Sequence, residues 1–315
     1  MRMGIAIDAA IDLPASFLEE HRITVMPIRI QLDGKTFQDD RDPQEIARFL
    51  AQGLGSRGHA AETAPESVEN VQKLFLERLA LAYDAVFCLT TSRTRSAIHD
   101  HVTRASFGVL KNYHAARAAA GIGGPFLLRV IDTRNLFAGA APLVVEATRL
   151  IAASHAVPAI RERLEALAGQ LYGYLLPHGD LHFLRARARK KGDHSVGLLS
   201  AMLGSALDLK PLIRAHRGDT VPVAKVRGFE AGCGMLLDYL ARRVRAGLLV
   251  PAVCISYGGD LAELPRLRGY AELQQACAER GVALLEAPMS LTGMVNAGAG
   301  ALAVGFAAEE HEPLS

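Results

Sequence analysis

Tryptophan is absent from the 315 residues of the chain, and aromatic residues make up only 6% of it. Few aromatic rings leave few platforms on which nucleic-acid bases could stack. The formal net charge is only +2, so the chain has no overall field that would attract nucleic acid or an acidic membrane. These two shortages disfavour a nucleic-acid-binding protein.

Cysteine is also scarce, and the four cysteines lie far apart without any CxxC pair. The histidines form no H-E-x-x-H or comparable motif, so the sequence predicts no metal site. Cys88 and Cys254 lie in apolar runs, where free cysteine behaves as a small hydrophobic residue. We expect reduced thiols and a cytoplasmic protein.

Long apolar segments are missing too, because no run reaches the roughly 18 residues that a membrane-spanning helix needs. The short apolar run near the N-terminus is interrupted by Asp8, which is not the pattern of a signal peptide. The chain has no P-loop and no kinase signature, and residues 298–303 do not complete a GxGxxG motif. The sequence therefore predicts neither a nucleotide cofactor nor a catalytic residue.

Half of the residues are hydrophobic, and in the first half of the chain short apolar runs alternate with helical patterns. Continuous apolar runs of this kind are typical of strands buried on both faces of a parallel sheet. We predict an α/β fold with two domains, a doubly wound parallel sheet in residues 1–154 and a second α/β domain in residues 155–315. The strands expected in the first domain are 4–7, 23–32, 84–91 and 125–132.

The helices expected in the first domain are 43–54, 67–83, 96–120 and 139–153. The strands expected in the second domain are 172–177, 221–227, 250–257 and 282–287. The helices expected there are 160–174, 196–209, 233–246 and 273–280, before a Gly-rich apolar segment at 291–306.

Polar residues follow three predicted strands: Asp8, the cluster at 90–94, and Asp132 with Thr133. Ligands bind at this edge of open parallel sheets, although the same residues could instead cap the helices that follow. The five polar residues TTSRT at 90–94 are more than one cap requires, which favours a ligand site there.

Two other segments allow a structural as well as a functional interpretation. Thr63 lies in AETAPES before a predicted helix and could be an N-cap with Glu66 as its capping-box partner. The basic run 185–191 could bind phosphates or form a solvated surface.

Eight segments, taken in order, resemble the conserved motifs of the DegV family, which bind fatty acids. The resemblance extends from residue 4 to about residue 306. The matching segments are DAAIDLP at 8–14, ITVMP at 23–27, TAPES at 63–67, TTSRTRS at 90–96, VIDT at 130–133, LGSALDLKPLI at 203–213, KVR at 225–227 and NAGAGAL at 296–302.

The resemblance implies a long-chain fatty acid, such as palmitate, stearate or oleate, in a tunnel between the two domains. Its carboxylate would lie at the domain interface against Thr63, Thr91, Thr90 and Asn296. The resemblance also implies a binding protein without a cofactor that presents the acid to a separate fatty acid kinase subunit. Two departures are Ala9, where the family has Ser, and Asn296, where it has His.

The family's Gly-Arg loop has no clear counterpart within residues 185–196, where Arg189 and His194 are the candidates. Two alternative functions also follow from the residues. One is a Rossmann-like enzyme acting on a small phosphorylated metabolite, with Asp8, Asp132 and the cluster at 90–94 at its site. The other, a nucleic-acid-binding regulator, depends only on the basic run 185–191.

Overall fold

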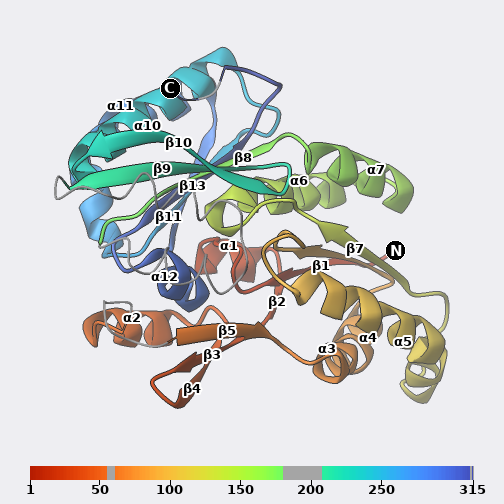
Figure 1. Ribbon diagram of the computed structural model, residues 1–315. Helices are drawn as coiled ribbons and strands as arrows, with labels where there is room; N and C mark the ends of the chain where they lie inside the picture. The colour runs from red at the N-terminus through yellow and green to blue at the C-terminus, as the bar shows by residue number, and fades with distance from the viewer. Residues whose placement is uncertain (55–60, 180–207, 313, 315) are drawn as a thin grey trace.

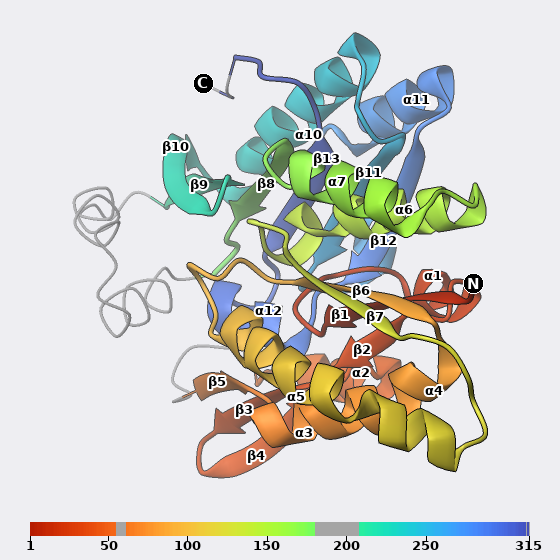
Figure 2. The same ribbon diagram turned by 90° about the vertical axis from the view of Figure 1, so that its right-hand side faces the viewer.

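The computed structural model describes residues 1–54, 61–179, 208–312 and 314. Within these residues the chain forms three β-sheets with helices packed against them (Figure 1). Figure 2 shows the layers edge-on: helices α3–α5, a parallel sheet, helices α6 and α7, a second large sheet, and helices α10 and α11. The predicted basic run 185–191, its neighbours up to 196, and most of the predicted helix 196–209 lie outside the described residues.

The first sheet has the strand order β2-β1-β6-β7, and all of its strands are parallel. Every residue of β6 is buried, as expected for a strand covered on both faces. This confirms the predicted parallel α/β fold of the first half. The strand bounds are β1 Met3–Asp8, β2 Thr24–Met26, β6 Ala85–Thr90 and β7 Leu127–Asp132.

Helices cover both faces of this sheet. The predicted helix 67–83 begins after Ser67, whose hydroxyl caps it, and contains one π-helical turn. The bounds are α1 Ala15–Glu20, α2 Pro43–Ala51, α3 Val68–Leu74, η1 Phe75–Leu79, α4 Ala80–Ala82, α5 Ile98–Ala119, η2 Phe137–Gly139, α6 Ala141–Ala152 and α7 Val157–Leu167.

A small antiparallel sheet with the order β4-β3-β5 extends from the edge of the first sheet. The single strand predicted at 23–32 is wrong here, because Pro27 separates β2 from β3. Proline has no N–H to continue a ladder, so the chain leaves the parallel sheet at this point and starts a new one. The bounds are β3 Ile28–Leu32, β4 Lys35–Asp39 and β5 Ala61–Pro65.

The second half forms a six-stranded sheet with the order β10-β9-β8-β13-β11-β12. Only β11 and β12 pair in parallel, and all other neighbours are antiparallel. The strands are β8 Leu171–Leu176, β9 Leu209–His216, β10 Asp219–Arg227, β11 Ala252–Tyr257, β12 Ala283–Pro288 and β13 Leu302–Ala307. The helices are α10 Phe229–Ala246, η3 Leu261–Arg266, α11 Tyr270–Arg280 and α12 Leu291–Ala297.

The second half differs from the prediction in several places, and strand β9 was not predicted at all. The predicted helix 160–174 ends at Leu167, and the strand β8 begins at Leu171. The Gly-rich segment 291–306 contains a short helix, α12, and a buried strand, β13. The predicted domain boundary at residue 154 stays a prediction. Helix α6, which ends just before this residue, contacts strands of both large sheets.

One hydrophobic core joins the two large sheets. It includes Ile5 and Leu89 from the parallel sheet, Val144 from α6, and Ala252 and Ala303 from the six-stranded sheet. A second cluster lies between the six-stranded sheet and helices α10 and α11. The shared core fixes how the two sheets face each other.

The turn η2 lies directly on two strands of the second sheet because glycines leave room for it. Gly305 of β13 pairs with Gly173 of β8, and both meet the backbone of η2. A methyl group on Gly305 would overlap the carbonyl oxygen of Ala138, and one on Gly173 would lie 3.1 Å from the Cα atom of Gly139. Main chain therefore packs against main chain at this point.

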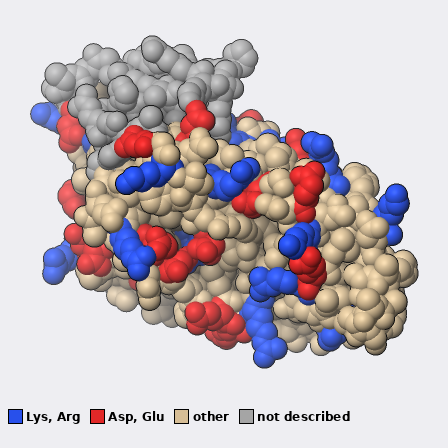
Figure 3. All heavy atoms as spheres, turned by 90° about the horizontal axis from the view of Figure 1, so that it is seen from below, with Lys and Arg blue, Asp and Glu red and all other residues tan. Residues whose placement is uncertain are grey.

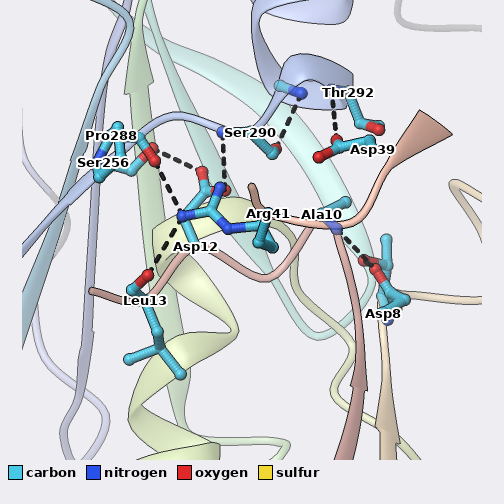
Figure 4. A network of polar contacts seen from close by, with 12 residues as sticks. Asp8, Ala10, Asp12, Leu13, Asp39, Arg41, Ser256, Pro288, Ser290 and Thr292 are labelled. Carbon is cyan, nitrogen blue, oxygen red and sulfur yellow. Dashed lines mark hydrogen bonds and ion pairs between the residues drawn. The ribbon is translucent and has the colours of Figure 1, made fainter. Parts of the chain in front are cut away.

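A buried ion pair connects loops from distant parts of the sequence (Figure 4). The guanidinium of Arg41 lies 2.8 Å from the carboxylate of Asp12, and neither side chain is more than 3% exposed. Arg41 also donates to the carbonyl oxygens of Leu13 and Pro288, at 3.1 and 2.9 Å. The loops after β1, β4 and β12 therefore meet at this one guanidinium.

Asp12 has two further donors from the second half of the chain. The hydroxyl of Ser256 donates to it at 2.5 Å, and the backbone N–H of Ser290 donates at 3.0 Å. These bonds compensate part of the cost of burying the two charges. Ser290 is also the N-cap of α12, so the ion pair fixes where that helix begins.

Replacing Arg41 with Met should lower the free energy of unfolding by about 3–5 kcal/mol, because the Asp12 carboxylate is left buried without its cation. Denaturant unfolding of the two proteins measures this difference. Arg48→Met is the matched control, since Arg48 is exposed and pairs with Glu45 on the surface of α2. The control should lose less than about 1 kcal/mol. Similar small losses in both variants would contradict the role of the ion pair.

Candidate ligand-binding site

A cavity of about 640 Å³ lies between the carboxyl edge of the parallel sheet and the six-stranded sheet. This volume falls within the range of about 300–1,000 Å³ that is usual for small-molecule sites. Much of its apolar wall comes from η2 and the second sheet: Leu136, Phe137, Tyr174, Leu175, Ile213, Ala215, Pro222 and Ala303. Many of its polar residues come from β5, the loop after β6 and α12: Thr63, Thr91, Arg93, Thr94, Ser96, Thr292 and Asn296.

Three of the four predicted ligand-binding residues line this cavity. Thr63, Thr91 and Asn296 come from β5, from the loop after β6 and from α12. They lie up to 233 residues apart in the sequence, and the fold brings them to one cavity. Their role in binding stays a prediction that requires measurement.

Thr90 is the predicted residue that the structure places elsewhere. Its hydroxyl lies 2.9 Å from Nδ1 of His99 and 3.4 Å from the carbonyl oxygen of Ile131, and the residue is fully buried. Successive side chains of a strand point to opposite faces, so Thr91 faces the cavity while Thr90 faces the packed helix α5. Thr90 therefore contributes to the core behind the site.

Thr63 lies on a strand and caps no helix. It pairs with Ile30 in the small antiparallel sheet, and the N-cap of the next helix is Ser67. The hydroxyl of Ser67 accepts a hydrogen bond from the backbone N–H of Asn70. The capping-box interpretation of Thr63 with Glu66 is therefore wrong, because the chain remains extended through residue 65.

The two acidic residues at strand ends have different partners, and neither caps a helix. Asp132 pairs with Arg93 at 2.8 Å and accepts a hydrogen bond from the backbone N–H of Arg134 at 2.8 Å. Asp8 is fully buried and accepts hydrogen bonds from the backbone N–H groups of Thr91 and Ala10, at 2.5 and 3.1 Å. The hydroxyl of Thr91 also donates to Asp8, at 2.9 Å.

Burial raises the pKa of Asp8 from its ordinary 3.8 to about 6. The hydrogen bonds from Thr91 and Ala10 oppose this change, and the nearby charge of Asp39 reinforces it. Burial likewise raises the pKa of Asp12 and of Asp39, while the Arg41 guanidinium acts in the opposite direction on both. Burial thus disfavours the charged form of all three carboxyl groups behind the cavity.

The sequence did not single out Thr292, although it lines the cavity. Its backbone N–H donates to the Asp39 carboxylate at 2.7 Å, and its carbonyl oxygen accepts from the Asn296 amide at 2.7 Å. Thr292 precedes Asn296 by four residues, which places both on one face of α12. This spacing is the sequence signal that could have identified Thr292.

Figure 3 shows one face of the molecule, on which acidic and basic side chains lie side by side. Among residues 1–54, 61–179 and 208–312, no group of three or more His, Cys, Asp or Glu side chains could hold a metal ion. In the same part of the chain, no helix has the length and apolar character required to cross a membrane.

The fold and the cavity define an α/β protein with a small-molecule cavity between a parallel and a mainly antiparallel sheet. The family model described as "Uncharacterised protein, DegV family" matches residues 2–309. A DegV domain-containing protein of Xanthomonas axonopodis pv. citri is 54% identical over 311 residues, which are 99% of each chain. The chain belongs to the DegV family.

Two solved structures share the fold of the chain at low sequence identity. A stearic-acid-binding protein from Eubacterium ventriosum has a TM-score of 0.74 and 21% identity, covering 97% of this chain and 98% of the other. The Fatty Acid Kinase B3 protein of Streptococcus pneumoniae, loaded with linoleic acid, has a TM-score of 0.71 and 18% identity, covering 98% of this chain and all of the other.

Replacing Asp8 with Asn should make stability less sensitive to pH between about pH 4 and 7. The raised pKa of Asp8 means that its stabilising contribution is complete below about pH 4 and is lost as the pH rises through about 6. The parent should therefore lose on the order of 2–3 kcal/mol relative to the variant over this interval. Denaturant unfolding of both proteins at several pH values measures the difference, and parallel curves would contradict the prediction.

Proposed function

We propose that this protein binds a long-chain fatty acid in the 640 Å³ cavity. The carboxyl group contacts Thr63, Thr91 and Asn296, and the acyl chain lies along the apolar wall from η2 and the six-stranded sheet. The observation that carries this proposal is the composition of the cavity, whose lining combines several hydroxyl groups with many apolar side chains. The fatty acids in the two structural neighbours support it.

The energetics of such a ligand agree with this arrangement. A carboxylate needs several hydrogen bonds to offset the loss of its water, and hydroxyl and amide groups can donate them. Burial of an acyl chain contributes about 0.8 kcal/mol per CH₂, or roughly 12 kcal/mol for a chain of sixteen carbons. Lost translational freedom and ordering of the chain reduce this gain. The remainder is enough for a ligand that survives purification.

We further propose that the protein is a binding subunit that presents the acid to a separate fatty acid kinase. The name of the pneumococcal neighbour, a Fatty Acid Kinase B3 protein, supports this assignment. The sequence has no P-loop of its own, so the phosphate donor requires another chain. All four cysteines are free and buried, which supports a place in the reducing cytoplasm.

Protein purified without added lipid should contain about one saturated or monounsaturated fatty acid per chain. Native mass spectrometry, followed by organic extraction, identifies the ligand and its stoichiometry. A bound nucleotide or sugar phosphate would contradict the proposal and support the enzyme hypothesis. Absence of any acyl chain, together with failure to bind added palmitate, would also contradict it.

Replacing Thr63 with Val should weaken palmitate binding roughly tenfold or more, because a hydrogen bond to a charged group contributes about 1.5–3 kcal/mol. Valine preserves the shape and suits a strand, so folding should be little affected. Thr36→Val on β4 of the same small sheet is the matched control, since Thr36 is exposed and does not line the cavity. Equal affinities of the two variants in a binding titration would remove Thr63 from the site.

A further inference from the structure

The cavity wall at Thr91 has a buried acid directly behind it. Thr91 and Ala10 line the cavity, and both donate backbone hydrogen bonds to the carboxyl group of Asp8. The hydroxyl of Thr91 donates to the same carboxyl group, with 2.9 Å between Oγ1 and Oδ1. Asp8 is fully buried, so the cavity reaches this acid through Thr91.

A threonine hydroxyl carries a single hydrogen atom, and Thr91 uses it for Asp8. The oxygen therefore offers only lone pairs toward the cavity while Asp8 is ionised. A ligand carboxylate also offers only lone pairs, so the two oxygens could not form a hydrogen bond. Two negative charges separated by one hydroxyl would also repel each other.

We infer that the cavity takes up its fatty acid together with one proton, which Asp8 and the ligand carboxyl group share through the hydroxyl of Thr91. This inference depends on the proposed function. It makes Asp8 a positioning residue that acts on the ligand through Thr91.

The proton comes from water, and no bond other than an O–H bond is formed or broken. In one arrangement the ligand is the neutral acid: its O–H donates to Thr91, and Thr91 donates to ionised Asp8. In the other, Asp8 is neutral: its O–H donates to Thr91, and Thr91 donates to the ligand carboxylate. The two arrangements differ only in the direction of the same hydrogen bonds.

The groups around Asp8 favour its protonation. Asp39 on β4 adds a negative charge, and the buried Cys88 thiol on β6 has a pKa raised well above its ordinary value, so it stays neutral. The nearest buried cation of the network, Arg41, forms its ion pair with Asp12. The pKa of Asp8 lies at about 6, so a proton is held there at little cost near neutral pH.

Other charged groups line the cavity but are not in contact with Asp8 through a hydrogen bond or ion pair among the described residues. Arg93 lies in the loop after β6 and pairs with Asp132. Arg95 follows in the same loop, and Asp100 lies in the first turn of α5. These cations attract the ligand from the cavity side without changing the hydrogen bond between Thr91 and Asp8. The proton therefore remains necessary at the Thr91 end of the site.

The test is proton uptake when myristate, kept below its critical micelle concentration, binds to the delipidated full-length protein. Titration calorimetry at pH 7.5 in two buffers of different ionisation heat gives the number of protons taken up. Myristate is ionised at this pH, because a carboxylic acid has a pKa of about 4. We expect uptake close to one proton, and a Kd that rises about tenfold per pH unit between pH 6.5 and 8.

Asp8→Asn should abolish both the proton uptake and the pH dependence, because the Asn amide donates to Thr91 as neutral Asp8 would. Asp84→Asn is the matched control: Asp84 lies at the opposite end of β6, pairs with Arg2 and Arg117, and should leave proton uptake unchanged. Tetradecanesulfonate, which stays ionised, can bind only in the arrangement with neutral Asp8, so the parent should bind it with uptake of one proton and Asp8→Asn should bind it without uptake.

Two negative outcomes have different meanings. Myristate that binds without proton uptake and with a constant Kd would overturn this inference and leave the proposed function intact. Failure of myristate to bind the parent at any pH from 6 to 8 would overturn the proposed function and this inference with it. Because uptake is measured on the parent protein, the test does not depend on whether Asp8→Asn folds.

Discussion

The buried ion pair between Asp12 and Arg41 determines where the parts of the site meet. It connects the loop after β1 and the segment before α2 to Ser256, Pro288 and Ser290 in the second half of the chain. Ser290 starts α12, the helix that carries two of the residues lining the cavity. A buried pair adds little net stability, but it requires one arrangement of the groups around it. Here that arrangement places α12 beside the cavity.

The same region contains more acids than bases. Asp8, Asp12 and Asp39 are buried close together, and Arg41 is the cation in contact with this network (Figure 4). Burial raises the pKa of each of the three carboxyl groups, and one guanidinium cannot neutralise all of them. The ion pair thus leaves Asp8 without a cation of its own. The ion pair that positions α12 at the cavity therefore also favours a protonated Asp8 behind Thr91.

Sequence patterns predicted the features that depend on local order. The apolar run at 84–91 became β6, and the motif resemblance led to Thr63, Thr91 and Asn296, which lie at one cavity. Features that depend on tertiary pairing were not predicted from the sequence. No periodicity relates Arg41 to Asp12, and a single proline moved half of a predicted strand into another sheet. Thr90 and Thr91 differ because side chains alternate along a strand, a rule that could have separated them.

The contact of η2 with Gly173 and Gly305 has a consequence for divergence within the family. Side chains of the core can be exchanged over time, and each exchange normally lets neighbouring elements shift. Here the spacing between η2 and the second sheet depends on the absence of side chains at Gly173 and Gly305 and on the Asn135 side chain, which donates to the carbonyl oxygens of Leu171 and Ala215. A side chain at either glycine would push η2 away from the sheet and change the width of the cavity, whereas other lining residues can change its chemistry without that shift.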